Sequence, residues 1–162
     1  MTLSYLVETA HQLRQPSAAA AKEFDASRDS LAEELSRQMA ARPDLEKLIG
    51  TGNLPMMHDN SRNFCRFMGT MFLAYEPEVL AQTALWVFRA YRSHGFRTTY
   101  WPANLDTFVE IVRARLTPTT FDELYPFFQW LIVNIPTFVK LSDEQLAEPL
   151  TPVPGHGPEA KP

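Results

Sequence analysis

The hydrophobic residues between Met56 and Gly95 recur at the spacing of two consecutive helices. Side chains three and four residues apart lie on one face of a helix. The second helix also carries Leu85, Trp86 and Phe88 on its other faces, which is typical of a helix inside a bundle. The first stripe consists of Phe64, Phe67, Met68, Met71, Phe72 and Tyr75, and the second of Val79, Leu80, Thr83, Ala84, Val87, Ala90 and Tyr91.

Proline and glycine mark where these two helices meet and end. Pro77 stands between them, and proline is tolerated in a first helical turn because the backbone N–H there has no helical partner. Gly95 predicts the C-terminus of the second helix, since glycine adopts the left-handed conformation at little cost. The pattern therefore predicts core helices at about 56–75 and 77–94, joined by a sharp corner.

Two further apolar stripes predict core helices at about 102–116 and 121–140. The second of them starts with the threonine and glutamate of a capping box, Thr120–Glu123. Pro126 and Pro136 each lack a backbone N–H, so we expect a kink near the first and a kink or an end near the second. Together the four helices predict an all-α fold.

The N-terminal third is more polar. Residues 17–42 combine a serine cap, an alanine run and many charges, and predict a long helix. Its narrow apolar stripe either packs on its own domain or meets a partner, and we expect a compact core to cover it poorly. This stripe consists of Phe24, Leu31, Leu35 and Met39. We expect three parts: an N-terminal helical arm at 1–42, a helical core at 43–148 and a disordered tail rich in proline and glycine at 149–162.

Two segments carry a resemblance to the globin-like superfamily. They are the corner Tyr75-Glu76-Pro77-Glu78-Val79-Leu80 and the helix end Phe88-Arg89-Ala90-Tyr91-Arg92-Ser93-His94-Gly95-Phe96. Both are similar to phycobiliproteins, and residues 95–116 are similar to sensor globins and to the heme-free globin domains of stressosome sensor proteins. The resemblance covers about residues 43–140 and implies globin-like packing with oblique helix crossings. A plain bundle with shallow crossings is the alternative.

The resemblance also implies a heme or bilin pocket and pairing of two copies through helices. Bilins attach to a cysteine before the corner, but Cys65 lies about two helical turns nearer to the corner than the matching place. Tyr91 stands where sensor globins have their heme-binding histidine. A tyrosine can ligate heme iron, yet an inward tyrosine is more often a core residue. The sequence therefore allows heme without favouring it, and the cofactor stays unknown.

Polar residues occupy inward-facing positions at the start of the first central helix. His58 and Asn60 from this end, with Tyr91 and His94 from the end of the second helix, are the candidate lining groups of a cofactor pocket. Alternatively, the polar residues near Asn60 cap the helix and hold the preceding loop. No two of the four histidines lie three or four residues apart, so we expect no metal site.

Composition narrows the function. One cysteine excludes an internal disulfide, and 15 Lys and Arg against 19 Asp and Glu give a net charge of -4. This charge argues against binding nucleic acid through an overall basic surface. No apolar run is long enough to span a bilayer and no leader pattern is present, so we expect a soluble, cytoplasmic protein without membrane partners.

The sequence contains no nucleophile elbow, phosphate loop or metal motif, and we assign no catalytic residue. We expect a non-enzymatic regulatory or sensory protein-interaction domain that works as a homodimer, with a further protein partner left open. The alternative is a sensor or carrier that binds heme, bilin or another small molecule between the two central helices.

Overall fold

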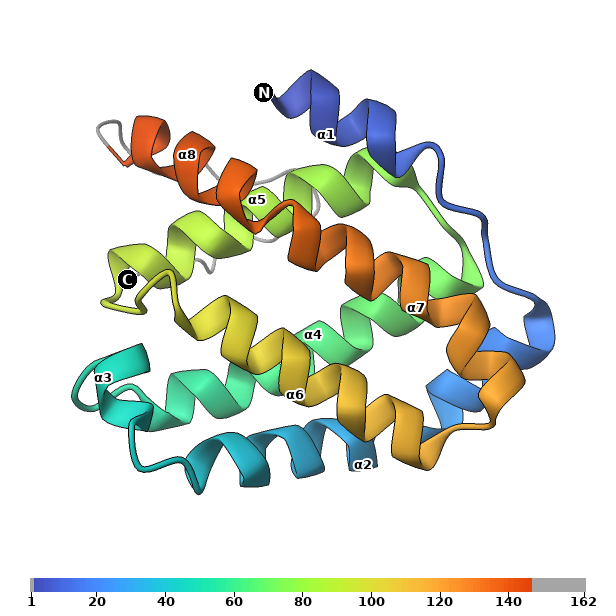
Figure 1. Cartoon of the computed structure of the whole chain (residues 1–162), viewed down its shortest axis with the longest axis horizontal. Helices are drawn as coiled ribbons and strands as arrows, with labels where there is room; N and C mark the ends of the chain where they lie inside the picture. Colours follow the sequence, from blue (N-terminus) through green and yellow to red (C-terminus); the bar gives the residue numbers. More distant parts are fainter. Residues whose placement is uncertain (1, 147–162) are drawn as a thin grey trace.

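The computed structural model describes residues 2–146 and contains eight α-helices and no strand over that range (Figure 1). The all-α prediction is confirmed. The predicted tail at 149–162 lies outside the described residues. In chain order the helices are α1 (Leu3–Ala10), α2 (Ala18–Ala40), α3 (Leu45–Ile49), α4 (Leu54–Leu73), α5 (Pro77–Ser93), α6 (Tyr100–Arg115), α7 (Pro118–Val133) and α8 (Ile135–Gln145).

The helix ends follow the prolines and glycines. Helix α5 begins at Pro77 and stops before Gly95, whose φ of 101° is left-handed, as predicted. The single helix predicted at 121–140 is instead α7 followed by α8, with Asn134 between them. Pro136 stands in the first turn of α8, where its missing N–H costs nothing, and Pro126 lies inside α7 without ending it.

The start of α7 differs from the predicted capping box. Thr117 is the N-cap, and Glu123 does not reach back along its own helix but accepts hydrogen bonds from the backbone N (2.8 Å) and hydroxyl (2.9 Å) of Ser17, the N-cap of α2. In return Glu23 of α2 accepts bonds from the backbone N (2.7 Å) and hydroxyl (2.9 Å) of Thr117 and from the hydroxyl of Thr120 (2.8 Å). Each glutamate thus caps the other helix, an arrangement we term the crossed caps.

Phenylalanines from four helices form the centre of the core. Phe24 of α2 meets Phe72 of α4 edge to face, with 4.9 Å between ring centroids. Phe72 contacts Phe127 of α7 at 5.2 Å, and Phe108 of α6 contacts Phe128 at 5.4 Å. The edge-to-face geometry is favourable because the positive ring edge lies against a negative face. These rings hold α2, α4, α6 and α7 together.

The expectation that the core would cover the α2 stripe poorly is wrong. Helix α2 packs most extensively on α4 and also on α6 and α7, so it is a layer of the core. Gly69 of α4 faces Phe24 of α2 at this contact, and a Cβ added there would lie 3.7 Å from the Phe24 ring, an ordinary van der Waals distance. The four stripe residues are each 0 % exposed: Phe24, Leu31, Leu35 and Met39.

Helices α7 and α8 run on in nearly the same direction, and α8 crosses α5 (Figure 1). Arg92 of α5 holds α8 in place. Its guanidinium donates to the Val139 carbonyl (3.2 Å) and the Ser142 hydroxyl (2.6 Å), and forms an ion pair with Asp143 at 2.6 Å. In the view of Figure 1, α7 and α8 cross the front of the molecule.

Candidate functional site

A buried polar network joins α4 to α6 where the sequence places its polar cluster. Asn60 of α4 donates from its amide to the Tyr100 hydroxyl at 3.3 Å. That hydroxyl donates to the Asn104 amide oxygen at 3.2 Å. All three side chains are buried, and burial raises the pKa of Tyr100 well above its usual range. Tyr100 therefore stays neutral and acts as both donor and acceptor.

Tyr91 of α5 adds a second phenol beside this network. Burial, and secondarily the Asp59 carboxylate, raise the pKa of Tyr91 to about 12, while a hydrogen bond with Asn63 opposes the shift. The Tyr91 phenol also contributes to the raised pKa of Tyr100, so the two hydroxyls are within electrostatic reach of each other. Neither phenol is ionised near neutral pH, so neither can act as a general base there.

Aromatic rings fill the space between the ends of α5 and α6. Phe88 stacks on Trp101 with ring centroids 4.5 Å apart, and Tyr91 meets Phe96 edge to face at 5.0 Å. The Trp101 indole N–H is buried and has no hydrogen-bond partner among the described residues. The Phe88 and Trp101 rings are thus in direct contact between α5 and α6.

The four predicted lining residues separate into two pairs. Asn60 and Tyr91 lie in or beside the network. His94 is the exposed C-cap of α5, and its backbone carbonyl accepts a bond from Asn53 at 2.8 Å. His58 is half-buried on α4 and makes no hydrogen bond to the Tyr100 network. Neither histidine side chain therefore takes part in the hydrogen-bonded Asn60–Tyr100–Asn104 network.

Sequence reasoning missed Tyr100 and Asn104. Their four-residue spacing at the start of α6 was the available signal, because such residues lie one above the other on a helix. The helix predicted from the sequence begins at about residue 102, so it does not include Tyr100, which is the first residue of α6. Its partner Asn60 is 40 residues away in the chain, so the pairing depends on how α4 and α6 pack.

Two described features bear on a heme and on a covalently attached bilin. A heme needs a flat slot, and direct contact between the Phe88 and Trp101 rings leaves none between them. Cys65 is buried on α4, and desolvation raises the pKa of its thiol to about 12, which suppresses the reactive thiolate. Within residues 2–146, no three His, Cys, Asp or Glu side chains gather closely enough to hold a metal ion.

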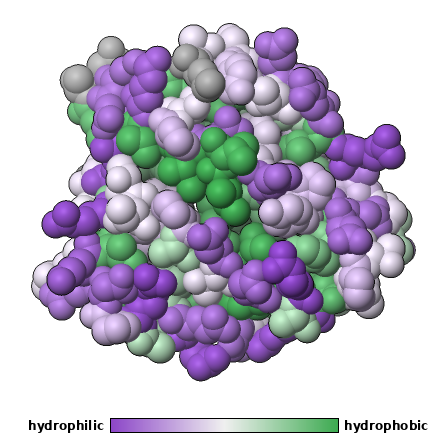
Figure 2. All heavy atoms as spheres, viewed as in Figure 1, coloured by the Kyte–Doolittle hydropathy of each residue, from purple (hydrophilic) through white to green (hydrophobic). Residues whose placement is uncertain are grey.

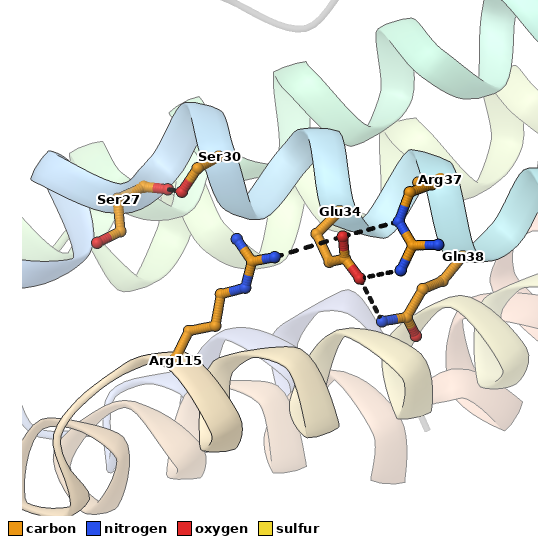
Figure 3. Close-up of polar contacts among 6 residues, drawn as sticks. All are labelled: Ser27, Ser30, Glu34, Arg37, Gln38 and Arg115. Atoms are coloured by element: carbon orange, nitrogen blue, oxygen red, sulfur yellow. Dashed lines mark hydrogen bonds and ion pairs between the residues drawn. The ribbon is translucent and has the colours of Figure 1, made fainter.

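A second polar cluster joins α2 to α6 around Glu34 (Figure 3). The Arg37 guanidinium donates two hydrogen bonds to this carboxylate, and the Gln38 amide donates one at 2.8 Å. The Arg115 guanidinium, at the end of α6, forms an ion pair with it at 3.3 Å. Hydrogen bonds from Arg37, then from Gln38, lower the pKa of Glu34 to about 2. The groove beside it, about 170 Å³ in volume, is walled by the same bonded groups and by Ile111. The cluster therefore fixes α2 against α6 and leaves Glu34 fully engaged.

Hydrophobic surface gathers where α7 meets α8, as the green area in Figure 2 shows when it is placed on Figure 1. Val133, the last residue of α7, is 63 % exposed, more than any other large hydrophobic side chain in the described part of the chain. Ile132 and Val139 lie half-buried beside it. We term Ile132, Val133 and Val139 the α7–α8 surface.

Comparisons with known protein families, with curated proteins and with solved structures find no match to this chain. Over residues 2–146, no helix has the length and apolar character needed to cross a bilayer.

Proposed function

We propose that this chain is a non-enzymatic regulatory or sensory protein-interaction domain with globin-like helix packing that works as a homodimer. The observation that carries the proposal is the α7–α8 surface with Val133 at its centre. Exposed apolar patches on globular domains mark interaction sites, because covering them removes apolar area from water. A second copy is the favoured occupant, since two-fold pairs are the commonest soluble oligomers.

This proposal moves the interface away from the N-terminal arm. The stripe of α2 is buried within its own chain, so it offers nothing to a partner. Helix α8, in contrast, has an outer face and is tied to α5 by Arg92. Arg92 follows Tyr91 in sequence, and this shared helix is the proposed route between the polar network and the interface.

Substitution of Val133 by arginine tests the interface. We expect light scattering to show a dimer for the wild-type chain at tens of micromolar and a monomer for V133R. An arginine at the centre of an apolar contact would lose its hydration without gaining an ion pair, which costs free energy on dimerisation. L73R is the matched control. Leu73 is 48 % exposed and is the last residue of α4, so arginine meets the same favourable helix C-terminus in both variants.

The control should remain dimeric and both variants should keep the wild-type helical circular dichroism. A monomeric wild-type chain would overturn the homodimer proposal. A dimeric V133R would overturn the choice of surface.

The alternative function, a heme, bilin or other small-molecule sensor, has its own test. An absorption spectrum with added hemin would show a Soret band if heme binds. Such a band would make the cofactor-binding interpretation the better one.

A further inference from the structure

An exposed row of residues follows the whole outer edge of α7 and α8. Its members alternate in steps of four and three, which keeps one face of a helix toward a neighbouring helix. Because α8 continues the direction of α7, the row spans both helices (Figure 1). We term it the α7–α8 ridge; its members, all exposed, are Asp122, Pro126, Gln129, Val133, Pro136, Lys140 and Asp143.

The middle of the ridge is mostly apolar, with Gln129 as its polar member, and both ends are charged. Tyr125, Ile132 and Val139 lie seven residues apart beside the ridge, are half-buried, and pack on the core with part of their surface left outside. They widen the apolar strip around Val133. A seam of this kind suits another helix of the same pattern more than an extended peptide.

The ridge carries two opposite charges, one toward each end, that form no ion pair within the described part of the chain. Asp122 stands near the start of α7 and Lys140 within α8, and neither forms an ion pair with any described residue of its own chain. Asp143, by comparison, is engaged by Arg92. Asp122 and Lys140 each lie nine positions from Leu131, one before it and one after it.

These positions distinguish the two ways of pairing identical ridges. A parallel pair would bring Lys140 next to a second Lys140 and Asp122 next to a second Asp122, which is unfavourable. An antiparallel pair with its two-fold axis at Leu131 brings each Lys140 opposite an Asp122, each Pro126 opposite a Pro136 and each Val133 opposite a Gln129. An antiparallel pair centred on Val133 would instead bring Asp122 near Glu144, again two like charges.

We infer that a second copy of this chain packs its α7–α8 ridge antiparallel on the first, with the two-fold axis at Leu131 and each Lys140 paired with the partner's Asp122. This inference rests on the proposed homodimer and specifies its geometry. The Pro126–Pro136 contacts, the Val133 methyl groups packed on the partner's Gln129 and the flanking apolar side chains supply the affinity, and the two ion pairs select orientation and register.

Charge exchange tests the pairing. We expect K140E and D122K each to raise the dimer dissociation constant about tenfold, since each change creates two like-charge contacts across the two-fold axis. The D122K/K140E double variant restores both opposite pairs and should return to within about threefold of wild type. Sedimentation equilibrium at low ionic strength gives the constants, and added salt should shrink the differences.

K22E and D106K are the matched controls. Lys22 and Asp106 are exposed, lie on α2 and α6, and form no ion pair with another described residue, so reversal of either charge should leave the dissociation constant unchanged. Single variants that dimerise like wild type, or a double variant that stays as weak as the singles, would overturn the antiparallel pairing. If V133R still gives a monomer, that outcome leaves the proposed dimer standing; if V133R is a dimer, the interface itself is wrong.

Discussion

Tyr100 is the residue on which the buried polar network depends. Its hydroxyl accepts a bond from Asn60 and donates one to Asn104, and the side chain is fully buried. Loss of the hydroxyl would leave two amide groups without this partner and away from water. An unsatisfied buried polar group costs more free energy than a made hydrogen bond contributes, so the phenol stabilises the packing of α4 on α6.

We therefore expect Y100F to lower the free energy of unfolding by about 1–3 kcal/mol. Urea titration followed by circular dichroism measures the change. Y5F is the control, because Tyr5 is 38 % exposed and its ring keeps contact with water. A Y100F protein as stable as wild type would mean that the network's amides find other partners.

At the scale of the element, the crossed caps decide how α2 and α7 begin. Glu23 lies six residues after its own N-cap, and Glu123 lies six residues after the other, so the two helix starts are equivalent halves of one contact. Each glutamate also lies near the positive end of the partner helix dipole. The backbone hydrogen bond from Thr117, more than those from the hydroxyls, holds the pKa of Glu23 below its ordinary 4.5.

We expect E23Q to destabilise the protein by about 1 kcal/mol at pH 7, the usual scale of a lost cap. A carboxyl whose pKa is lowered by folding contributes stability above its ordinary pKa and loses it as pH falls. The difference between wild type and E23Q should consequently shrink as pH falls below 4.5. Urea unfolding between pH 3 and pH 7 measures it, with E33Q at an exposed, unpaired glutamate of α2 as control.

A pH-independent difference between wild type and E23Q would contradict this account of the caps. A thermodynamic cycle with T117A provides a second check, because both changes affect the hydrogen bond from the Thr117 hydroxyl to Glu23. Their effects on the unfolding free energy should fall short of additivity.

Local signals in the sequence predicted most elements, and long-range contacts set the rest. Ser17 and Gly95 bound α2 and α5 as predicted, because caps act within one turn. Pro136 predicted either a kink or a helix end, and the structure has a helix end, with Asn134 between α7 and α8. In the buried polar network, Asn60 was named from the sequence as a candidate pocket residue, but its hydrogen-bond partner Tyr100 was not. Glu123 was assigned to its own helix because nothing local indicates a bond to Ser17, 106 residues away.

At the scale of the whole molecule, the N-terminal helices are part of the core. Phe24 contacts Phe72 and Phe108, which belong to α4 and α6. The Tyr75 hydroxyl donates to the Ala10 carbonyl at 2.5 Å, and the Trp130 indole donates to the Thr9 hydroxyl at 2.9 Å. The middle of the described chain and helix α7 thus pack on α1 and α2.

We expect a chain that starts at Pro43 to be unfolded or molten at 25 °C. It would lose the entire α2 stripe, and each buried Leu, Phe or Met contributes about 1.5–3 kcal/mol, against a total stability of about 5–15 kcal/mol. Far- and near-ultraviolet circular dichroism with thermal unfolding measures the outcome. A cooperative unfolding transition in the shortened chain would show that residues 43–146 form a core on their own.

The crossed caps also bear on how fast the protein loses its structure. Their hydrogen bonds span 94 to 106 residues, so they can form only after most of the chain has been brought together. Contacts of this range tend to be made late, on the native side of the folding barrier. Such contacts slow unfolding more than they speed folding. The crossed caps, Glu23 with Thr117 and Glu123 with Ser17, therefore act mainly on the lifetime of the folded chain.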